Sequence, residues 1–291
     1  MANRFREKLL SGQFVITTEV CPPKGCDCGQ FLATARMLAP LVDAINVTDN
    51  QGANMRISPL AAAALLVREG IEPIYQITCR DRNRLALQSD LLGAAALGIT
   101  NILALTGDHI SFGDHPGGKP VFDLDSVQLL DTVTRLNNGR DLSGTTLDSA
   151  PAFFPGAAAA PEAEPFEPTR YKLAKKVSSG ALFLQTQAIF DFGKFARFSE
   201  LVAPLGVKVI AGVIVLKSAG MARYINRNIP GLTVPTEVVA ELEGSTDQLA
   251  AGVTIATRLA RSLAPHCDGI HLMAMGREEV IPQIVNSLDI T

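Results

Sequence analysis

The sequence predicts an α/β protein with a single domain, a (β/α)8 or TIM barrel, from three observations. First, eight short apolar runs alternate with helix-like segments over the 291 residues. Second, at least six of the runs end at a small or polar residue; the run 102–105 stops at Gly107, and Asp108 follows. Third, the number of these runs is eight, which is the number of strands that a closed barrel of this kind requires. In such barrels the carboxyl ends of the strands form the active site, so residues that follow the runs are candidates for function.

The first half of the chain supplies four of these strands. The first is expected to end at Pro22-Pro23, because proline cannot continue a central ladder, and Glu19 therefore lies at or next to its carboxyl end. Ser58, Pro59 and Gly70 mark a helix with an N-cap, a first turn and a stop. The strands expected here are 14–23, 44–51, 73–79 and 101–107, and the helices are 30–42, 58–68 and one after residue 84 that ends near 96.

Residues 109–170 form an excursion that is the least regular part of the chain. Residues 109–120 are rich in glycine and polar side chains and are predicted to form a mobile active-site loop before a helix at 125–136. Residues 151–161 predict a short strand that runs into a loop of small residues, where a backbone could approach a ligand closely. The alternative for this stretch is a flexible linker between two domains.

Regular alternation returns after residue 170. Gln185 and Gln187 are expected on one face of their strand and Thr186 on the other, because side chains alternate along a strand. The last strands are expected at 181–190, 208–215 and 269–275, and the helices at 171–178, at 191–202, as a pair within 219–262, and after residue 277.

Composition excludes several classes of protein. The formal net charge is −3, and the basic residues neither cluster nor alternate with aromatic residues, so no nucleic-acid partner is expected. No apolar run approaches the roughly 18 residues of a membrane span, and no signal-peptide core follows the first eight residues. Five cysteines, an odd number, indicate reduced thiols and a cytoplasmic protein.

Cys21, Cys26 and Cys28 lie close together and raise the question of a metal. Without a fourth thiol or a histidine nearby, free thiols are favoured over a zinc or iron–sulfur site. The chain also lacks the spaced ligands of a metal hydrolase, a Gly-x-Ser-x-Gly elbow and a Walker loop. The sequence therefore predicts no metal in the site.

Polar residues collect at the predicted carboxyl ends of the strands. Two carboxylates that face one cavity from separate strands suit a general acid held protonated near neutral pH. Glutamine suits neutral hydrogen bonding to a heterocycle, and arginine or lysine suits an anionic group. The candidates are Glu19, Thr48, Asp49, Gln76, Thr78, Thr106, Asp108, Gln187, Lys217 and Arg277.

Several of these residues have a purely structural alternative. Asp49 could equally cap the next helix, and Gln76 could be a satisfied interior polar group. Lys217 is more typical of a solvated loop, and His109 of a surface residue, than of a ligand contact or a catalytic base. His271 stands between two apolar residues and is interpreted as a satisfied core histidine.

Three motifs resemble those of the methylenetetrahydrofolate reductase family. Residues 18–23, Thr-Glu-Val-Cys-Pro-Pro, are similar to its Glu-x-x-Pro-Pro opening. Residues 105–108, Leu-Thr-Gly-Asp, are similar to its Leu-Arg-Gly-Asp motif, and residues 186–191 to its Thr-Gln-Phe-Phe-Phe-Asp strand. The motifs occur in matching order and spacing from about residue 12 to 290.

The resemblance implies a barrel that binds FAD and reduces 5,10-methylenetetrahydrofolate to 5-methyltetrahydrofolate, or runs the reverse reaction. Glu19 would be the general acid that protonates the folate. Asp108 would lie near the flavin and the pterin, where its charge favours a cationic intermediate. Gln187 would hydrogen-bond the folate, and Arg277 would help to hold it.

The resemblance also implies a set of flavin contacts. FMN remains an alternative to FAD, because only the region 150–176 would touch the adenylate. The implied contacts are Thr48, Gln76, Thr106, Gly107, Asp108, Phe122, Asp123, Phe154, Thr169, Lys172 and Lys176.

Departures from the family pattern bear on the electron donor. Thr106 replaces an arginine, Ala219 stands near the position of a phenylalanine that packs against the nicotinamide, and Met273 replaces a tyrosine. The loss of both aromatic rings removes stacking surface for a dinucleotide. A reduced nicotinamide is therefore not expected to bind in the usual way. The hypothesis is that a partner subunit donates the electrons, with a reduced nicotinamide as the alternative, and a homo-oligomer is a further alternative to a single chain.

Two other functions remain open. One is a pterin-binding methyltransferase barrel without flavin, and the other is a non-catalytic barrel subunit of a complex. The pair Glu19 and Asp108 counts against the second, because a scaffold has no need of two carboxylates in one apolar mouth.

Overall fold

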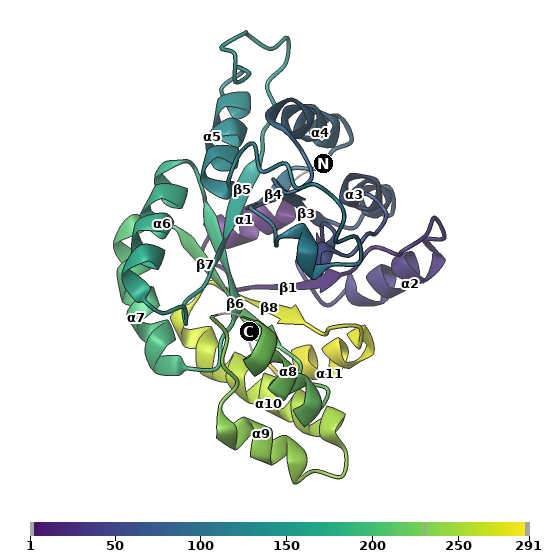
Figure 1. The fold of residues 1–291 in the computed structure, drawn as a ribbon, viewed down its shortest axis with the longest axis vertical. Helices are drawn as coiled ribbons and strands as arrows, with labels where there is room; N and C mark the ends of the chain where they lie inside the picture. Colours follow the sequence, from purple (N-terminus) through teal and green to yellow (C-terminus); the bar gives the residue numbers. More distant parts are fainter. Residues whose placement is uncertain (1–2, 230, 289–291) are drawn as a thin grey trace.

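The computed structural model describes residues 3–229 and 231–288. Within them, eight parallel strands form a closed barrel in sequence order, and β8 pairs with β1 to complete it. The helices surround the strands as an outer layer (Figure 1). This confirms the predicted (β/α)8 fold. No helix in the described part of the chain is long and apolar enough to cross a membrane.

Each strand falls inside a stretch predicted as one, because runs of buried apolar residues bounded by turn residues identify parallel strands well. The observed strands are β1 Val15–Val20, β2 Ala44–Val47, β3 Pro73–Thr78, β4 Asn101–Leu105, β5 Phe154–Ala159, β6 Phe183–Ala188, β7 Lys208–Ile214 and β8 Gly269–Met273.

The helices agree with the prediction less closely. The described residues of 219–263 hold three helices rather than two, because Asp247 caps a new helix by accepting a hydrogen bond from the Ala250 N–H at 3.0 Å. The helix expected at 171 begins at residue 166, and a short first helix was not predicted. The observed helices are α1 Arg4–Leu10, α2 Gly29–Leu38, α3 Pro59–Arg68, α4 Arg84–Ala96, α5 Ser126–Asn137, α6 Phe166–Ser178, α7 Phe192–Val202, α8 Ala219–Asn228, α9 Thr236–Glu243, α10 Gln248–Leu263 and α11 Ile281–Ser287.

The small residues of 156–159 belong to strand β5, so the predicted small-residue loop and the alternative of a domain linker are both wrong. β5 pairs with β4 on one side and with β6 on the other. Gly156 is required there, because a Cβ on it would lie 2.2 Å from the Phe183 ring. The barrel interior at this level is already filled by that ring, and only small residues fit beside it.

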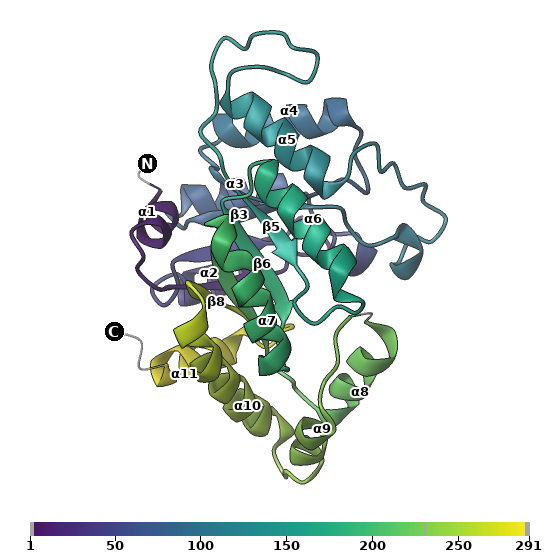
Figure 2. The ribbon, with the colours of Figure 1, turned by 90° about the vertical axis from the view of Figure 1, so that its left-hand side faces the viewer.

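Helix α1 closes the amino end of the barrel. It lies at one side of the molecule and α8 at the other (Figure 2). Phe5 and Leu9 are fully buried in a cluster with residues from seven strands, β1 to β7. The Phe5 ring packs edge-on against those of Phe154 and Phe183, with centroids 6.0 and 5.5 Å away. Packing at this end supports stability, as is usual for the amino face of such barrels.

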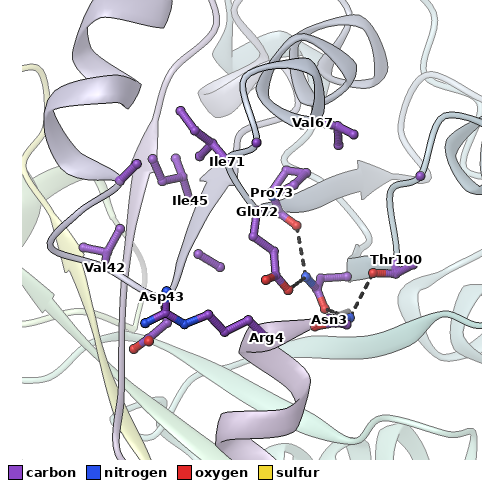
Figure 3. A pocket seen from close by; sticks show the side chains of 15 residues that line it. Asn3, Arg4, Val42, Asp43, Ile45, Val67, Ile71, Glu72, Pro73 and Thr100 are labelled. Atoms are coloured by element: carbon purple, nitrogen blue, oxygen red, sulfur yellow. Dashed lines mark hydrogen bonds between the residues drawn. The ribbon is translucent and has the colours of Figure 1, made fainter. Parts of the chain in front are cut away.

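A cavity of about 230 Å³ also opens at the amino end, beside α1 (Figure 3). One of its two carboxylates, Glu72, accepts hydrogen bonds from the Phe5 N–H at 3.2 Å and from Asn101 Nδ2 at 2.9 Å. Burial raises the pKa of Glu72. These bonds anchor the first turn of α1. The second carboxylate, Asp43, pairs with Lys8, so both carboxylates of this cavity have structural partners.

Candidate active site

A cavity of about 610 Å³ lies at the carboxyl ends of the strands, within the range typical of small-molecule sites. The loops after β2, β3 and β4, the end of β5, helix α6, and strands β1, β6 and β8 contribute to its wall. Eleven of the candidate site residues and implied flavin contacts line it together: Glu19, Asp49, Gln76, Thr78, Thr106, Gly107, Asp108, Thr169, Lys172, Lys176 and Gln187.

Glu19 reaches the cavity from the interior face of β1 and is 8% exposed. Gln51 Nε2 donates a hydrogen bond to its Oε1 at 3.3 Å. Its Oε2 lies 3.7 Å from Nε2 of His271 on β8. The carboxyl group is therefore held at one oxygen by an amide and faces an imidazole with the other.

Asp108 follows β4 and lines the same cavity as Glu19. Gly107, with φ +92°, turns the chain before it, and a Cβ at Gly107 would lie 3.1 Å from Cβ atoms of Thr78 and Arg80. The Arg80 Nη1 donates to the Asp108 carbonyl oxygen at 3.5 Å. This loop is thus fixed by close packing against the end of β3.

Arg80 is a site residue that the sequence analysis did not single out. Its side chain is 2% exposed and lines the cavity. The guanidinium makes two hydrogen bonds to the carboxylate of Asp81, at 2.9 and 2.8 Å. It also donates to the Asn50 carbonyl oxygen at 3.4 Å, so it links the loops after β2, β3 and β4. The sequence signal that could have identified Arg80 is its position directly after the apolar run 73–79, which predicts a strand.

Three buried polar atoms of the cavity wall lack a hydrogen-bond partner among the described residues. They are Gln185 Oε1, Ser126 Oγ and His271 Nε2. Buried polar atoms are normally paired, so unpaired ones in a cavity wall fit a ligand that supplies donors and acceptors. The interpretation of His271 as a fully satisfied core histidine is therefore wrong, although its ring is buried.

The α6 side of the cavity is cationic. Thr169, Lys172 and Lys176 project from this helix, and the Lys176 Nζ donates to the Ala158 carbonyl oxygen at 2.5 Å. Burial, reinforced by the charge of Lys172, lowers the pKa of Lys176 to about 8. Ammonium groups beside unpaired hydroxyl and amide groups suit a ligand with a heterocyclic part and an anionic part.

Strand β6 departs from the predicted alternation. A register shift between Gln185 and Ala188 interrupts its pairing with β7. Thr186 Oγ1 accepts a hydrogen bond from the Gly212 N–H at 2.8 Å and donates to the Gln187 carbonyl oxygen at 2.7 Å. As a result Gln185, Thr186 and Gln187 all border the cavity, rather than alternate residues alone.

Phe154 does not border the cavity. It stands at the amino end of β5, fully buried in the cluster beneath α1, and its ring stacks on Phe183 with centroids 5.3 Å apart. Its proposed flavin contact is contradicted, because a residue at the start of a strand faces the opposite end of the barrel from the residues that follow the strands.

Four other residues implied by the resemblance also lie outside the cavity lining. Phe122 has φ 43° and stacks on the His109 ring. Hydrogen bonds from Arg84 engage Asp123 and lower its pKa to about 2. Arg277 pairs with Glu279 at 2.5 Å. Thr48 is buried just after β2, and its Oγ1 has no partner in the described part of the chain.

Asp49 has a structural role that differs from the helix cap considered for it. Its carboxylate accepts hydrogen bonds from the Thr78 N–H and Oγ1, both at 2.8 Å, and from the Arg82 Nη1 at 2.7 Å. The buried ion pair ties the end of β2 to the end of β3, and its removal would loosen the loop that carries Arg80.

The cysteines do not form a metal site in the described part of the chain. All five are free thiols, and Cys26 is exposed. Among residues 3–229 and 231–288, no three His, Cys, Asp or Glu side chains gather closely enough to hold a metal ion.

Solved structures with other activities share the fold. A tryptophan synthase structure from M. tuberculosis superposes with a TM-score of 0.52 at 11% identity, over 98% of this chain and 92% of that one. At this level of identity the likeness concerns the barrel alone.

Relatives that are similar in sequence are more informative. A Salmonella typhimurium protein named 5,10-methylenetetrahydrofolate reductase is 24% identical over 294 residues, which cover 97% of this chain and 93% of the relative. A Caenorhabditis elegans protein named probable methylenetetrahydrofolate reductase (NADPH) is 26% identical over 235 residues, or 78% of this chain. This chain spans about a third of that longer relative, 34% of its length.

The match to a family model extends over nearly the whole chain. The model described as methylenetetrahydrofolate reductase matches residues 4–289. This range includes all eight strands and every residue of the cavity wall. The chain therefore belongs to the methylenetetrahydrofolate reductase family.

Proposed function

We propose that this chain is an oxidoreductase that reduces 5,10-methylenetetrahydrofolate to 5-methyltetrahydrofolate, or runs the reverse reaction, with a flavin. The observation that carries the proposal is that Glu19 and Asp108, from β1 and from the loop after β4, line one cavity of about 610 Å³. Membership of the family and the names of the relatives support the choice of substrate.

The cavity wall fits a flavin by its chemistry. Gln76 and Gln185 offer amide groups for the edge of a heterocycle, and Lys172 and Lys176 offer cations for its phosphate. FAD is the cofactor we propose, and FMN would use the same cationic side. When bound, the flavin would supply the hydride that reduces the methylene carbon.

The residues of the chain then have distinct roles. Glu19, buried and held at Oε1 by Gln51, would give its proton to a ring nitrogen of the folate, so that the five-membered ring opens. The carboxylate of Asp108 would stabilise the positive charge that develops. Gln187 would hydrogen-bond the pterin. We leave out Arg277, because it pairs with Glu279 outside the cavity.

Purification under mild conditions tests the function directly. We expect a yellow protein that releases FAD on denaturation and whose reduced form is reoxidised by 5,10-methylenetetrahydrofolate without oxygen. A colourless protein that does not take up added FAD or FMN would instead favour a flavin-free pterin methyltransferase. A yellow protein that is inert toward folate would favour a non-catalytic subunit.

For the electron donor we propose a partner subunit. Among the described residues that line the cavity there is no Phe, Tyr or Trp on which a nicotinamide could stack, and Met273 stands at its edge. We expect dithionite to reduce the bound flavin at once. NADH or NADPH should reduce it at least about a hundredfold more slowly than if the nicotinamide stacked on an aromatic side chain, because roughly 3 kcal/mol of binding and orientation is lost. Rapid bleaching by either nucleotide alone would contradict a partner donor.

Flavin affinity is expected to fall as the pH rises. Lys176 has its pKa lowered to about 8, so it is charged at pH 7 and loses its proton as the pH passes through 8. Loss of a cation that faces a phosphate should weaken FAD binding about fivefold to tenfold between about pH 7 and pH 9. Quenching of flavin fluorescence on titration measures the dissociation constant.

Two variants on α6 separate this effect from a general one. Lys176→Met should bind FAD weakly at both pH values, with a flat profile. Lys175→Met removes an exposed lysine one position away and should keep the wild-type profile. If Lys176→Met retains the pH dependence, another group is responsible.

A further inference from the structure

His271 brings an imidazole to Glu19 from β8, which is far from β1 in the sequence. β8 pairs with β1 in a register that sets His271 beside Thr17. The ring is 1% exposed, its Nδ1 lies 3.0 Å from Thr17 Oγ1, and its Nε2 lies 3.7 Å from Glu19 Oε2. Thr17 and Glu19 are two residues apart on one strand, so both side chains point to the barrel interior.

The contact with Thr17 decides which ring nitrogen faces Glu19. With Nδ1 engaged by the hydroxyl group, the ring is held in one orientation, and Nε2 is left without a hydrogen-bond partner in the described residues. A buried nitrogen is rarely left unpaired. Glu19 Oε2 is near enough that a small rotation of the carboxyl group would complete a hydrogen bond.

We propose, on the basis of the function proposed above, that Glu19 and His271 share one dissociable proton and that His271 is the positioning residue of the acid. The proton resides on Glu19 Oε2 or on His271 Nε2, and the pair is neutral overall in either arrangement. On reaction the Glu19 O–H bond breaks as an N–H bond forms on the folate. Glu19 is left as a carboxylate beside a neutral imidazole, and a proton from water restores the pair.

Other charged groups of the cavity are engaged elsewhere or lie on other strands. Asp49 is bound by Arg82, and Arg80 by Asp81. Lys176 donates to a carbonyl oxygen of β5. The remaining charged groups of the wall, Asp108 and Lys172, come from the loop after β4 and from α6. Among the described residues, His271 is the basic side chain that pairs with the Glu19 carboxyl, at 3.7 Å.

The shared proton would keep the acid available at neutral pH. An imidazole ordinarily holds a proton to a higher pH than a carboxyl group does. A pair with two sites for one proton therefore keeps that proton at a pH where an isolated carboxyl group would have lost its own. This gives a function to a histidine that packing alone does not require.

Turnover of the flavin-loaded protein as a function of pH tests the pair. His271→Gln retains an amide of similar reach but binds no proton, and it should lose about tenfold in kcat near pH 7.5 and less than about threefold near pH 5.5. Thr17→Val, which frees the ring, should move the profile in the same direction by less. Thr18→Val is the matched control: it also removes a buried hydroxyl that contacts β8, but on the outer face, and should leave the profile unchanged.

A second readout does not depend on activity. In protein labelled with ¹⁵N-histidine, the His271 ring signals, assigned from their loss in His271→Gln, should titrate at lower pH in Glu19→Gln than in the wild type. If His271→Gln lowers kcat equally at every pH, or if the His271 signals titrate at the same pH in Glu19→Gln as in the wild type, the two groups do not share a proton. Wild-type protein that never turns over folate would overturn the proposed function instead, and the ring signals would still report on the pair.

Discussion

Replacement of Glu19 by glutamine is expected to lower kcat for folate reduction by about 10²- to 10⁴-fold, the usual contribution of a general acid. The amide keeps the size of the side chain and can still contact Gln51, so the cavity should persist and the flavin should remain bound. What is lost is the proton that opens the folate ring. Stopped-flow reoxidation of the reduced flavin by 5,10-methylenetetrahydrofolate measures the step itself.

Glu72→Gln provides a matched control for Glu19→Gln. Glu72 is also a partly buried carboxyl group near the barrel interior, but it lies at the amino end and anchors α1. Its replacement should cost some stability and leave the turnover of folded protein near that of the wild type. Turnover that survives in Glu19→Gln, or that fails equally in Glu72→Gln, would show that Glu19 is not the acid.

Gly212→Ala is expected to destabilise the protein by about 2–4 kcal/mol, because the new methyl group would meet backbone rather than a flexible side chain. A Cβ at Gly212 would lie 2.4 Å from the Thr186 carbonyl oxygen and 2.7 Å from that of Gln187. The bulge in β6 would have to move, and Gln187 with it. We expect the Tm to fall by about 5–10 °C and the KM for folate to rise.

Gly25→Ala is the control for the glycine substitution. No atom lies within 4 Å of the position that its Cβ would take, and its φ lies outside the left-handed region. It should change the Tm by less than about 2 °C. A Gly212→Ala protein with wild-type Tm and KM would mean that the bulge yields without cost and does not set the position of Gln187.

Sequence patterns predicted the barrel well because they report on burial. Buried parallel strands give short apolar runs, and turns give glycine, so all eight strands fell within the expected ranges. Helix α1 was missed, because seven residues are too few for a clear helical period. In β5 the small residues suggested a loop, since nothing local reveals that the Phe183 ring occupies the space beside Gly156.

The candidate site was predicted less completely for a similar reason. Glu19 and Asp108 follow from strand ends alone, which are local features. The environment of His271 depends on Thr17, 254 residues earlier in the chain, and no local pattern carries that contact. Phe154 was assigned by resemblance within the irregular stretch 109–170, where a shift of a few residues moves a side chain from one end of a strand to the other.

The pairing of β8 with β1 has a consequence for biosynthesis. A ribosome makes the carboxyl group at position 19 long before it makes the imidazole at position 271. A partly synthesised chain can bury apolar surface and form several strands of the barrel, but it cannot bring these two groups together. Catalytic activity should consequently arise in one step, when β8 pairs with β1. Truncated chains that lack β8 should be inactive.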